Sequence, residues 1–583
     1  MKKYIGYIIP TILLVIAIFL FYVTFFNDAL MTKAFSYVGY YIVLILFAIW
    51  LITLFEYMRF YNIDLRSLVR TNKYGILVCL MFTAFIIISV KPCFRVLSDE
   101  TNLFSVSRSM LYEKRTDNIT TGLWYYDSFY PIYGPGIEKR PLLFPFLTNV
   151  IHSFFGYRIE NVFILNYIIL FSLLLLIYTI VRKDLGEKWA TCAVALVAGQ
   201  PIVSQVATSG AFDLCAALFI MITFVALRNF LKEPSAIRFQ FLFINMLMLN
   251  NIRHEGIVAF IVIMGFLLIR KYKYIKLEYF KKEAFIVFYA APLIFLLTLW
   301  QRLLTRDPFE TRGEPAFSLS YFSSNNLSFL KSLVEYKFFL PYATIVDFIG
   351  FIGLIYIVYR FIALRPEKER WQKHLITIVV LWLVATWTIF ASYHTGRLDH
   401  PSSCRYYVTF FALLSVCAVY FVNRFEILRS KPVMGIILSV LIFVIYNGVS
   451  VGNKFTVGQI AVRKNNFIGD FLKRETAKTK NILVVVDRPG QLIVHNYGAV
   501  HFGYAKSNPG FIRGFKQHLV ETVFIIQEIE YKTGKPIKGQ DLDDKFVLET
   551  VAELQNTPSV FIRISKLVDI KESRAPAKPA PSH

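Results

Sequence analysis

Long apolar runs, separated by short polar segments, cover most of the chain as far as Gly452. A run of about 20 apolar residues is long enough to cross a bilayer as a helix. We predict thirteen membrane spans, at 4–26, 36–58, 74–90, 161–181, 189–207, 212–231, 239–250, 255–269, 284–301, 341–359, 374–392, 406–423 and 433–451. The runs 239–250 and 255–269 are short for full crossings and are interpreted as a broken or tilted pair. The first run is interpreted as a span because it is longer than a signal core and no small-residue cleavage site follows.

The pattern changes after Gly452. Short apolar runs typical of buried strands follow at 481–488, 522–529 and 559–566, with helix-like stretches between them, such as Leu542 to Leu554. We therefore expect a small α/β domain at 453–570, after a transmembrane domain at 1–452. The tail at 571–583 is rich in Pro, Ala and Lys and is predicted to be disordered.

Composition and charge support a polytopic membrane protein. The 583 residues are 56% hydrophobic and only 17% charged, with a mean hydropathy of +0.52 and less charge than a soluble chain carries. With the N-terminus inside, the predicted inside segments hold 26 Lys and Arg, and short outside segments of similar total length hold 9. The net charge of +24 is thus attributed to topology, and no nucleic acid partner is expected. The same bias places the large loop at about 91–160, the loop 394–405 and the C-terminal domain outside.

The cysteines and histidines indicate no metal site. The six Cys contain no CxxC spacing, which excludes a disulfide scaffold or a Cys-type zinc site by pattern. Cys93 and Cys404 both fall in predicted outside loops, so a bridge between them stays open. His394, Asp399 and His400 match no standard ligand spacing. We predict no metal and no other cofactor.

Asp99 and Glu100 are the first candidates for chemistry, because they follow directly after a predicted span. The next residues repeat apolar side chains at helical spacing, as in a helix that lies on the membrane surface. A carboxylate partly desolvated there binds protons more tightly and can act as a general base. The alternative is an ordinary pair of solvated carboxylates.

Several cations fall on the same predicted outside face. Lys139 and Arg140 precede a short apolar run, and Arg253 and His254 lie between two short apolar pieces. Asp213 sits at the outer edge of a span, where a charged group is usually paired or functional. Arg397 and Arg405 lie in the loop 394–405. Because Arg suits bidentate contact with phosphate, these cations favour a phosphate-bearing lipid substrate. The alternative is that they anchor the chain to lipid headgroups.

Three motifs in this order resemble the GT-C glycosyltransferases, in particular the lipid A aminoarabinose transferases and the protein O-mannosyltransferase-like enzymes. They are the acidic pair with its following helix, Lys139-Arg140-Pro141-Leu142 in place of a Lys-Pro-Pro-Leu-like motif, and the Gly210 to Asp213 element. The likeness covers about residues 75 to 270, with a weaker echo at Arg405-Tyr406. Two extra spans before the acidic loop depart from the family pattern, as do Arg253 and His254, which stand where the family often has Lys.

The resemblance implies a GT-C fold and transfer of a sugar from a polyprenyl-phosphate donor to a lipid, glycan or protein acceptor. It implies an inverting displacement with Asp99 as base, Glu100 assisting or tuning it, and Asp213 orienting acceptor or sugar. Lys139, Arg140, Arg253 and Arg405 would stabilise the departing phosphate. We expect a multi-pass protein of the bacterial inner membrane, with a cytoplasmic N-terminus.

Two other functions stay open from the sequence. A secondary transporter usually carries ionisable residues near mid-membrane, whereas the carboxylates here cluster at span ends. An O-antigen ligase or polymerase-like enzyme would depend on Arg and His of the loop 394–405, and the acidic pair would then be incidental.

Overall fold

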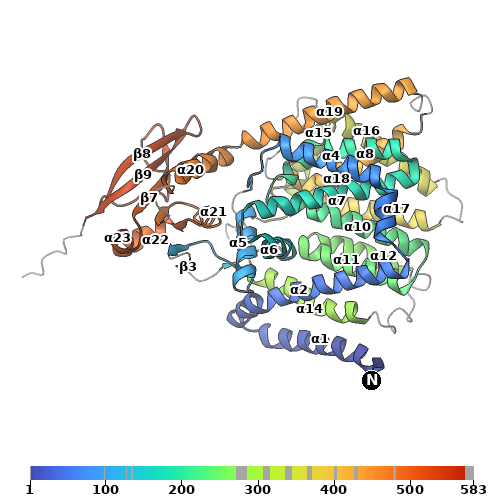
Figure 1. Ribbon diagram of the computed structural model, residues 1–583, viewed down its shortest axis with the longest axis horizontal. Helices are drawn as coiled ribbons and strands as arrows, with labels where there is room; N and C mark the ends of the chain where they lie inside the picture. Colours follow the sequence, from blue (N-terminus) through green and yellow to red (C-terminus); the bar gives the residue numbers. More distant parts are fainter. Residues whose placement is uncertain are drawn as a thin grey trace, which may run out of the picture. The chain divides into compact units, whose positions relative to one another are not determined.

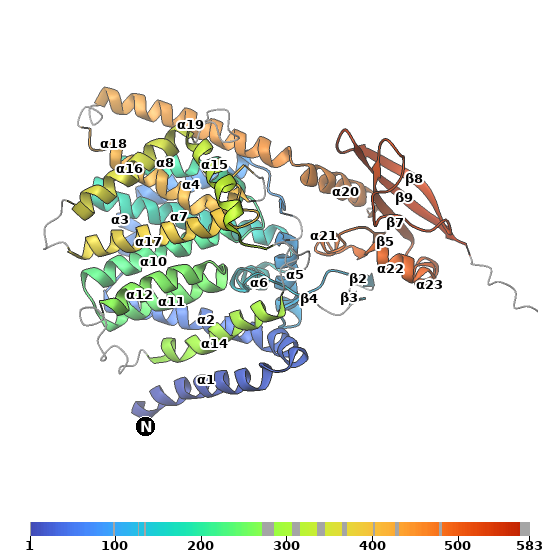
Figure 2. The same ribbon diagram turned by 180° about the vertical axis from the view of Figure 1, so that it is seen from behind.

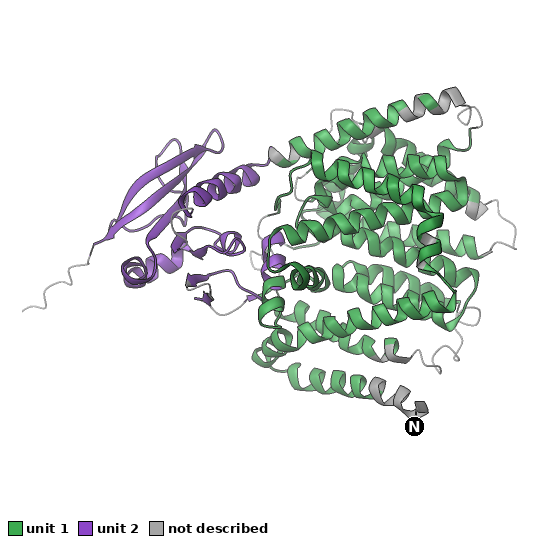
Figure 3. Ribbon diagram, viewed as in Figure 1, with its two compact units in different colours: residues 1–96, 107–116, 137–456 green, residues 97–106, 117–136, 457–583 purple. Residues whose placement is uncertain are grey.

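The computed structural model describes residues 2–96, 99–125, 128–132, 136–270, 285–305, 315–334, 344–363, 370–399, 403–425, 431–476 and 481–571. The chain divides into two compact units (Figure 3). Unit 1 contains Met1–Val96, Ser107–Thr116 and Ile137–Thr456, and unit 2 contains Leu97–Val106, Asp117–Gly136 and Val457–His583. The tail that we predict to be disordered begins at Lys571, and its residues 572–583 lie outside the described residues.

Unit 1 is a bundle of apolar helices (Figures 1 and 2). Its helices are α1 (Lys2–Thr24), α2 (Asp28–Phe60), α3 (Leu65–Thr71), α4 (Lys73–Ser89), α6 (Leu143–Phe155), α7 (Glu160–Leu185), α8 (Glu187–Ala198), α9 (Pro201–Ala207), α10 (Asp213–Lys232), α11 (Ala236–Ile252), α12 (Gly256–Ile269), α14 (Phe285–Leu304), α15 (Leu319–Val334), α16 (Thr344–Ala363), α17 (Arg370–Ser392), α18 (Val408–Val422) and α19 (Lys431–Val457), with the short 3-10 helix η4 (Cys404–Tyr407) before α18. Helix α5 (Asp99–Tyr112) begins in unit 2 and ends in unit 1.

Among the described residues, five helices are long and apolar enough to cross a membrane: α2, α7, α10, α17 and α18, the last counted together with η4. The helices α8 and α9, which meet at a bend of 71°, make a sixth if the two together form one span. Each of the thirteen predicted spans coincides with helix, but several of these helices are short. The mainly helical, multi-pass architecture is therefore confirmed, while the number of thirteen crossings stays a prediction.

The bend between α8 and α9 replaces the single predicted span at 189–207. Pro201 stands at the first position of α9, where its missing N–H costs nothing, and the preceding chain is extended at Gln200. Helix α19 packs against this bend at its glycines. A Cβ on Gly448 would overlap the carbonyl oxygen of Gly199, and one on Gly452 would overlap the hydroxyl of Ser204. The bend therefore depends on close contact between backbones.

Unit 2 is built on a seven-stranded sheet with the order β3-β2-β6-β5-β7-β9-β8. Its strands are β2 (Gly122–Tyr125), β3 (Ser128–Pro131), β5 (Ile482–Val485), β6 (Gly498–Val500), β7 (Thr522–Glu530), β8 (Phe546–Gln555) and β9 (Val560–Ile570), and the separate pair β1 (Asp117–Asn118) and β4 (Gly136–Ile137) lies nearby in sequence. The central β6, β5 and β7 are parallel, and the remaining pairs are antiparallel. β5, β7 and β9 lie within or close to the runs predicted as strands.

Helices cover both faces of this sheet. The helices of unit 2 are α20 (Ile460–Thr476), α21 (Gly490–Ile493), α22 (Phe502–Ser507) and α23 (Pro509–Gly514), followed by the π-helix η6 (Phe515–Leu519). Phe502 and Ile512 pack on one face, and Phe471 and Leu492 on the other. Leu123, on β2, belongs to the first core. Part of the loop that was expected to belong with the spans therefore completes the core of unit 2.

Two local predictions need correction. The stretch from Leu542 to Leu554 was expected to be helix-like, and the structure has β8 there, paired with β9 along its length. Strand pairing overrides the weak helical preference of its Leu, Glu and Ala residues. Helix α5 forms as predicted, but nearly all of its positions are buried, whereas a helix lying on a membrane surface buries one side only.

We predict that Gly448→Val lowers the thermal unfolding midpoint of the protein by several degrees, because the added side chain forces α19 away from the α8–α9 bend at a cost of about 1–3 kcal/mol. Gly435→Val, on the same helix with open space around its Cα, is the matched control and should leave the midpoint nearly unchanged. Thermal unfolding in detergent followed by tryptophan fluorescence measures both. Equal midpoints for the two variants would contradict the close contact.

Candidate active site

The connection between α11 and α12 brings a guanidinium and an imidazole to one end of the bundle. Arg253 ends α11 in an extended conformation, and the chain turns through His254 and Glu255 into α12. The reversal is tight, because a Cβ on Gly256 would lie 2.6 Å from the carbonyl oxygen of Leu249. Glycine is therefore required where the two short helices meet.

The carboxylate of Asp213 is fully buried at the start of α10. Its Oδ1 accepts a hydrogen bond from Nη1 of Arg253 at 2.9 Å, and its Oδ2 lies 3.7 Å from Nη1 of Arg405. Both arginine side chains are less than a tenth exposed. One carboxylate thus pairs with guanidinium groups from two segments about 150 residues apart in the chain. A buried charge needs such partners.

The turn before α10 is held in place by the side-chain amide of Asn166. Its Nδ2 donates to the carbonyl oxygens of Ser209, at 2.7 Å, and Ala211, at 3.0 Å. These bonds satisfy two carbonyl oxygens of a buried turn, where no helical hydrogen bond is available to them. They also fix where α10 begins, and with it the position of Asp213.

Aromatic rings surround the two guanidinium groups. The Arg253 guanidinium lies 4.9 Å from the ring centre of Tyr406 and 5.2 Å from that of Phe390, and the Arg405 guanidinium lies 5.5 Å from the Tyr406 ring. Cation–π attraction holds the charged groups against these faces and restricts their rotamers. Tyr406 therefore orders both arginines.

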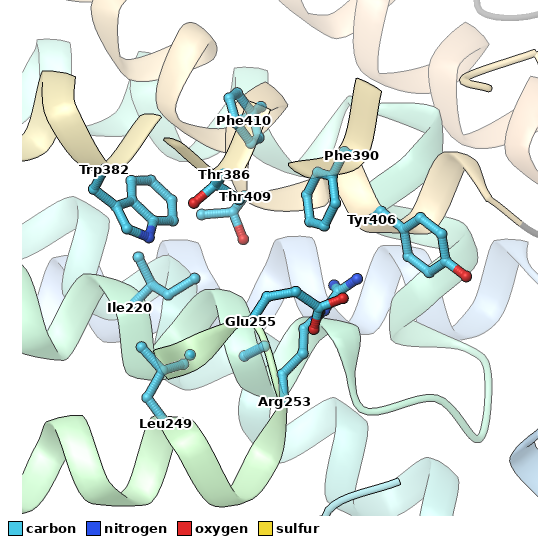
Figure 4. Close-up of a pocket in the computed structure, with 12 residues that line it drawn as sticks. Ile220, Leu249, Arg253, Glu255, Trp382, Thr386, Phe390, Tyr406, Thr409 and Phe410 are labelled. Carbon is cyan, nitrogen blue, oxygen red and sulfur yellow. Dashed lines mark hydrogen bonds and ion pairs between the residues drawn. The ribbon is translucent and has the colours of Figure 1, made fainter. Parts of the chain in front are cut away.

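Arg253 and Glu255 line a narrow pocket with a volume of about 20 Å³ (Figure 4). Nε of Arg253 donates to Oε2 of Glu255 at 3.0 Å, and Figure 4 shows this pair beside Tyr406 and Phe390. The other end of the pocket is apolar and includes Trp382. The pocket therefore joins a paired cation and anion at one end to apolar side chains at the other.

A second group of cations surrounds His254. Its Nε2–H donates to the carbonyl oxygen of Lys139 at 2.8 Å. Nε2 of Gln301, near the end of α14, donates to the carbonyl oxygens of Glu138, at 2.7 Å, and Arg140, at 2.5 Å. Two distant segments thus tie down the loop that carries Lys139 and Arg140.

The charges in this second group do not cancel. Nη1 of Arg140 pairs with Oε1 of the buried Glu138 at 2.5 Å. Lys139 and Arg302 are exposed, and within the described part of the chain no ion pair joins either of them to a carboxylate. The loop therefore presents net positive charge.

His254 is neutral at pH 7. The pKa of its imidazole is lowered to about 4, first by burial and then by the nearby Arg302 guanidinium. The imidazole therefore acts as a hydrogen-bond donor that fixes the Lys139 loop, and not as a further cation.

Asp99 and Glu100 form the first turn of α5. Glu100 is buried, and Asp99 is partly exposed. Carboxylates at the N-terminal end of a helix are stabilised in the ionised form by the helix dipole. Both residues belong to unit 2, whereas the cations described above belong to unit 1.

Arg397 stands apart from the buried cluster. Its Nε and Nη2 bind the two carboxylate oxygens of Asp399 at 2.9 and 2.5 Å, and the arginine side chain is 57% exposed. The hydrogen bonds from Arg397 lower the pKa of Asp399. His400, which was considered with Asp399 as a metal ligand, lies outside the described residues.

A Ser-His-Asn chain links side chains of three helices in unit 1. Nδ2 of Asn161 lies 2.8 Å from Nδ1 of His152, and Nε2 of His152 lies 3.2 Å from the hydroxyl of Ser107. These contacts tie α5 to α6.

Among the described residues, no group of three or more His, Cys, Asp and Glu side chains is placed to hold a metal ion. The predicted absence of a metal cofactor stays a prediction. Cys404 is buried and Cys93 is partly exposed, and a bridge between them stays an open alternative.

The motifs did not single out two polar residues near the two cation groups, Arg95 and Arg302. Nη2 of Arg95 donates to the hydroxyl of Thr208, and its charge acts on Cys404, next to Arg405. Arg302 lies at the end of a predicted span and is one of five Lys and Arg in the outside segment 302–340. That excess of cations in an outside segment was the signal for it.

The chain matches a known protein family over part of its length. Residues 139–300 match the profile of the family described as dolichyl-phosphate-mannose-protein mannosyltransferase. This range contains Lys139, Arg140, Asp213, Arg253 and His254. A search of curated proteins finds no significant match in sequence.

Similar solved structures include ArnT from Cupriavidus metallidurans. Its structure bound to undecaprenyl phosphate has a TM-score of 0.52 and 11% identity, and the match covers 85% of this chain and 98% of that one. The apo structure of the same enzyme has a TM-score of 0.52 and 13% identity, with the same coverage. The apo oligosaccharyltransferase of Archaeoglobus fulgidus has a TM-score of 0.46 and 14% identity, covering 80% of this chain and 71% of that one, which is too distant to support an argument.

The family match and the ArnT-like fold confirm the resemblance that the sequence motifs carry. The roles of the individual site residues are not tested by either comparison.

We predict that Asp213→Asn strongly destabilises the protein, because it leaves two buried guanidinium groups without their shared carboxylate. Removing one partner of a buried ion pair costs about 3–5 kcal/mol. Asp399→Asn is the matched control, since its pair with Arg397 is exposed and is worth about 1 kcal/mol or less. Thermal unfolding midpoints of the two variants measure the difference. Midpoints that fall equally would show that Asp213 is not the anchor of the cluster.

We also predict that stability falls as the pH drops from about 6.5 towards 4. An imidazole in the unfolded chain protonates near pH 6.5, whereas the His254 pKa in the folded protein is about 4. The unfolded state therefore binds more protons in this window, and the free energy of unfolding decreases as the pH is lowered. His254→Gln keeps an N–H donor but does not titrate, so its unfolding midpoint should fall less between pH 7 and pH 5. A variant that follows the wild-type profile would refute the assignment.

Proposed function

We propose that this chain, a membrane glycosyltransferase of the GT-C superfamily, transfers a sugar from a polyprenyl-phosphate donor to an acceptor hydroxyl on the extracytoplasmic face of the membrane. The acceptor is a lipid, a glycan or a protein. ArnT from Cupriavidus metallidurans binds undecaprenyl phosphate in its crystal structure, and we extend this class of carrier to the present chain.

The observation that carries the proposal is the pocket beside Arg253. A guanidinium ordered by Asp213 and Tyr406 stands at one end, and apolar side chains, among them Trp382 and Phe410, line the rest. A prenyl phosphate has the same division, with a charged head on a hydrocarbon chain. Arginine recognises phosphate, as it does carboxylate, through paired hydrogen bonds.

In the proposed reaction, Asp99 takes the proton from the acceptor hydroxyl. The hydroxyl oxygen then forms a bond to the anomeric carbon of the sugar as the bond from that carbon to the phosphate oxygen breaks. The electron pair of the broken bond remains on the polyprenyl phosphate, and one in-line displacement inverts the anomeric centre. Asp99 stands in the first turn of α5 and is partly exposed, so its carboxylate is accessible to an acceptor.

The leaving phosphate needs positive charge and no acid. Arg253 and Arg405 supply it from the buried cluster, and Lys139 and Arg140 supply it from the loop that His254 holds. Fixed cations in a site of low dielectric stabilise charge that develops in the transition state without reorganising.

We assign the remaining candidates to supporting roles. Asp213 is a positioning residue, because its carboxylate is fully buried and occupied by Arg253 and does not line the pocket. Glu100 tunes Asp99 from the same helical turn. Arg397, exposed and paired with Asp399, is a surface contact for the donor or the membrane.

We further propose a multi-pass protein of the bacterial inner membrane with a cytoplasmic N-terminus. The excess of Lys and Arg in the predicted inside segments supports this orientation. It puts the start of α10 and the end of α17, which carry Asp213 and Phe390, at the outer face.

Asp99→Asn should abolish sugar transfer, with a loss of rate of about 100-fold or more if the carboxylate is the base. Glu113→Gln is the control, because Glu113 follows α5 in sequence and is 41% exposed. The measurement is transfer from a polyprenyl-phosphate-linked sugar in membranes of cells that express each variant, followed by mass spectrometry of lipids and surface glycans.

Equal expression and equal thermal unfolding midpoints of the two variants are required for this comparison. Unchanged transfer by Asp99→Asn would refute the proposed base and would favour a ligase-like enzyme that depends on the loop 394–405. Flux of a sugar across vesicles without any transfer product would refute the enzyme interpretation altogether.

A further inference from the structure

A second, larger cavity lies among the membrane helices of unit 1. It has about 1340 Å³ of empty space, open space at its mouth included, and its walls come from α7, α10, α16, α17 and α18. Nearly all of the lining is apolar, as at Met221, Val379 and Leu413. Four of these five helices are long and apolar enough to cross a membrane. A cavity with such a lining favours an apolar chain over a polar solute.

The polar groups of this cavity gather at one end. Nη2 of Arg228 lies 3.4 Å from Oδ1 of Asp184, and the hydroxyl of Tyr420 donates to Oδ2 of Asp184 at 2.7 Å. Trp371 and Gln372 line the same cavity from the first turn of α17. The arginine and aspartate side chains are 25% and 33% exposed, so both remain accessible from outside.

This polar end is at the opposite face of the bundle from the candidate active site. Asp184 and Arg228 lie in the last turns of α7 and α10, and Tyr420 lies near the end of α18. Asp213 instead begins α10, and Tyr406 precedes α18. The Lys and Arg bias predicts that the face with Asp184 is cytoplasmic.

Aromatic side chains separate the two cavities. Phe410 lines both of them. The Trp382 ring lies 5.1 Å from the Phe224 ring and 6.1 Å from the Phe410 ring, measured between centres. A lipid that enters from the Asp184 end therefore meets a wall before it reaches the pocket beside Arg253.

We propose that this cavity binds one molecule of a zwitterionic phospholipid of the phosphatidylethanolamine class, with its headgroup at Arg228 and Asp184 and an acyl chain pointing towards the aromatic wall. A neighbouring guanidinium and carboxylate match the phosphate and the ammonium of this headgroup. An anionic headgroup without an ammonium would leave Asp184 facing negative charge. Trp371 suits the interfacial depth at which such a headgroup lies.

This site is separate from the proposed sugar transfer, because its headgroup residues Asp184 and Arg228 take no part in it and, among the described residues, the two cavities share only Phe410. Its role is to fill the space between α10, α17 and α18 and so to hold the opposite ends of these helices in place. An empty cavity of this size among apolar side chains forfeits their packing contacts.

The test uses the full-length protein, stripped of lipid in detergent and titrated separately with dioleoyl phosphatidylethanolamine and dioleoyl phosphatidylglycerol. Native mass spectrometry counts the bound lipids, and thermal unfolding reports their effect. We expect one phosphatidylethanolamine per chain, bound about tenfold or more tightly than phosphatidylglycerol. Asp184→Asn should reduce this preference towards unity.

Val379→Phe fills the cavity and should weaken phosphatidylethanolamine binding by about tenfold or more. Val384→Phe makes the same change on the same helix at a side chain that is 59% exposed, and should bind as the wild type does. Ile376→Phe, also in the lining, replaces Val379→Phe if that variant fails to accumulate.

Three results would overturn the proposal. The first is equal binding of the two phospholipids by the wild type, and the second is unchanged phosphatidylethanolamine binding by both cavity-filling variants. The third is displacement of the bound phospholipid by undecaprenyl phosphate in competition, which would assign the cavity to the donor chain instead.

Discussion

The buried carboxylate of Asp213 is the constraint on which the candidate active site depends. A charge without solvent needs opposite charge and hydrogen bonds around it, and Arg253 and Arg405 are the groups that meet this need. Because these arginines stand at the end of α11 and just before α18, the ion cluster draws the start of α10 and two distant segments to one point. The rings of Tyr406 and Phe390 then fix the Arg253 guanidinium at the pocket, and the Tyr406 ring also contacts Arg405. The order of the cations thus comes from the same interactions that close the bundle at this end.

The two cation groups differ in the net charge that they offer to a bound anion. In the buried cluster the arginines are matched by Asp213 and Glu255, so it contributes direction and order more than net charge. Around His254 the net charge is positive, because Lys139 and Arg302 are exposed and Glu138 forms its ion pair with Arg140. A neutral His254 joins the two groups, since it follows Arg253 in the chain and holds the Lys139 loop by a hydrogen bond. An ordered guanidinium beside a loop of surplus positive charge is an arrangement suited to a phosphate that must bind and later leave.

Much of this architecture is predictable from local pattern, because apolar runs of span length leave helices as almost the only solution. The residues Asp213, Arg253 and Arg405 are likewise recognisable one at a time, since each is charged at the edge of an apolar run. Their pairing is not, because contacts between residues 40 and about 190 positions apart depend on how helices pack. The strands β2 and β3 are four residues each, too short for a reliable pattern. Only the pairing of β2 with β6 and with β3, and the burial of Leu123, reveal that they belong to unit 2. The segment of β8 is wrongly predicted as helix-like for a related reason. Its pairing with β9 decides its conformation, and this pairing cannot be read from the segment itself.

The central claim is that ordered guanidinium groups beside an apolar pocket recognise the phosphate of a prenyl carrier. The most direct measurement compares the affinity of the purified wild-type protein for undecaprenyl phosphate with its affinity for undecaprenol, which has the same chain and no phosphate. The account predicts binding of the phosphate about tenfold or more tighter, a difference of about 1.4 kcal/mol or more, and a preference that weakens as salt is raised. Equal affinity for the two lipids would contradict it.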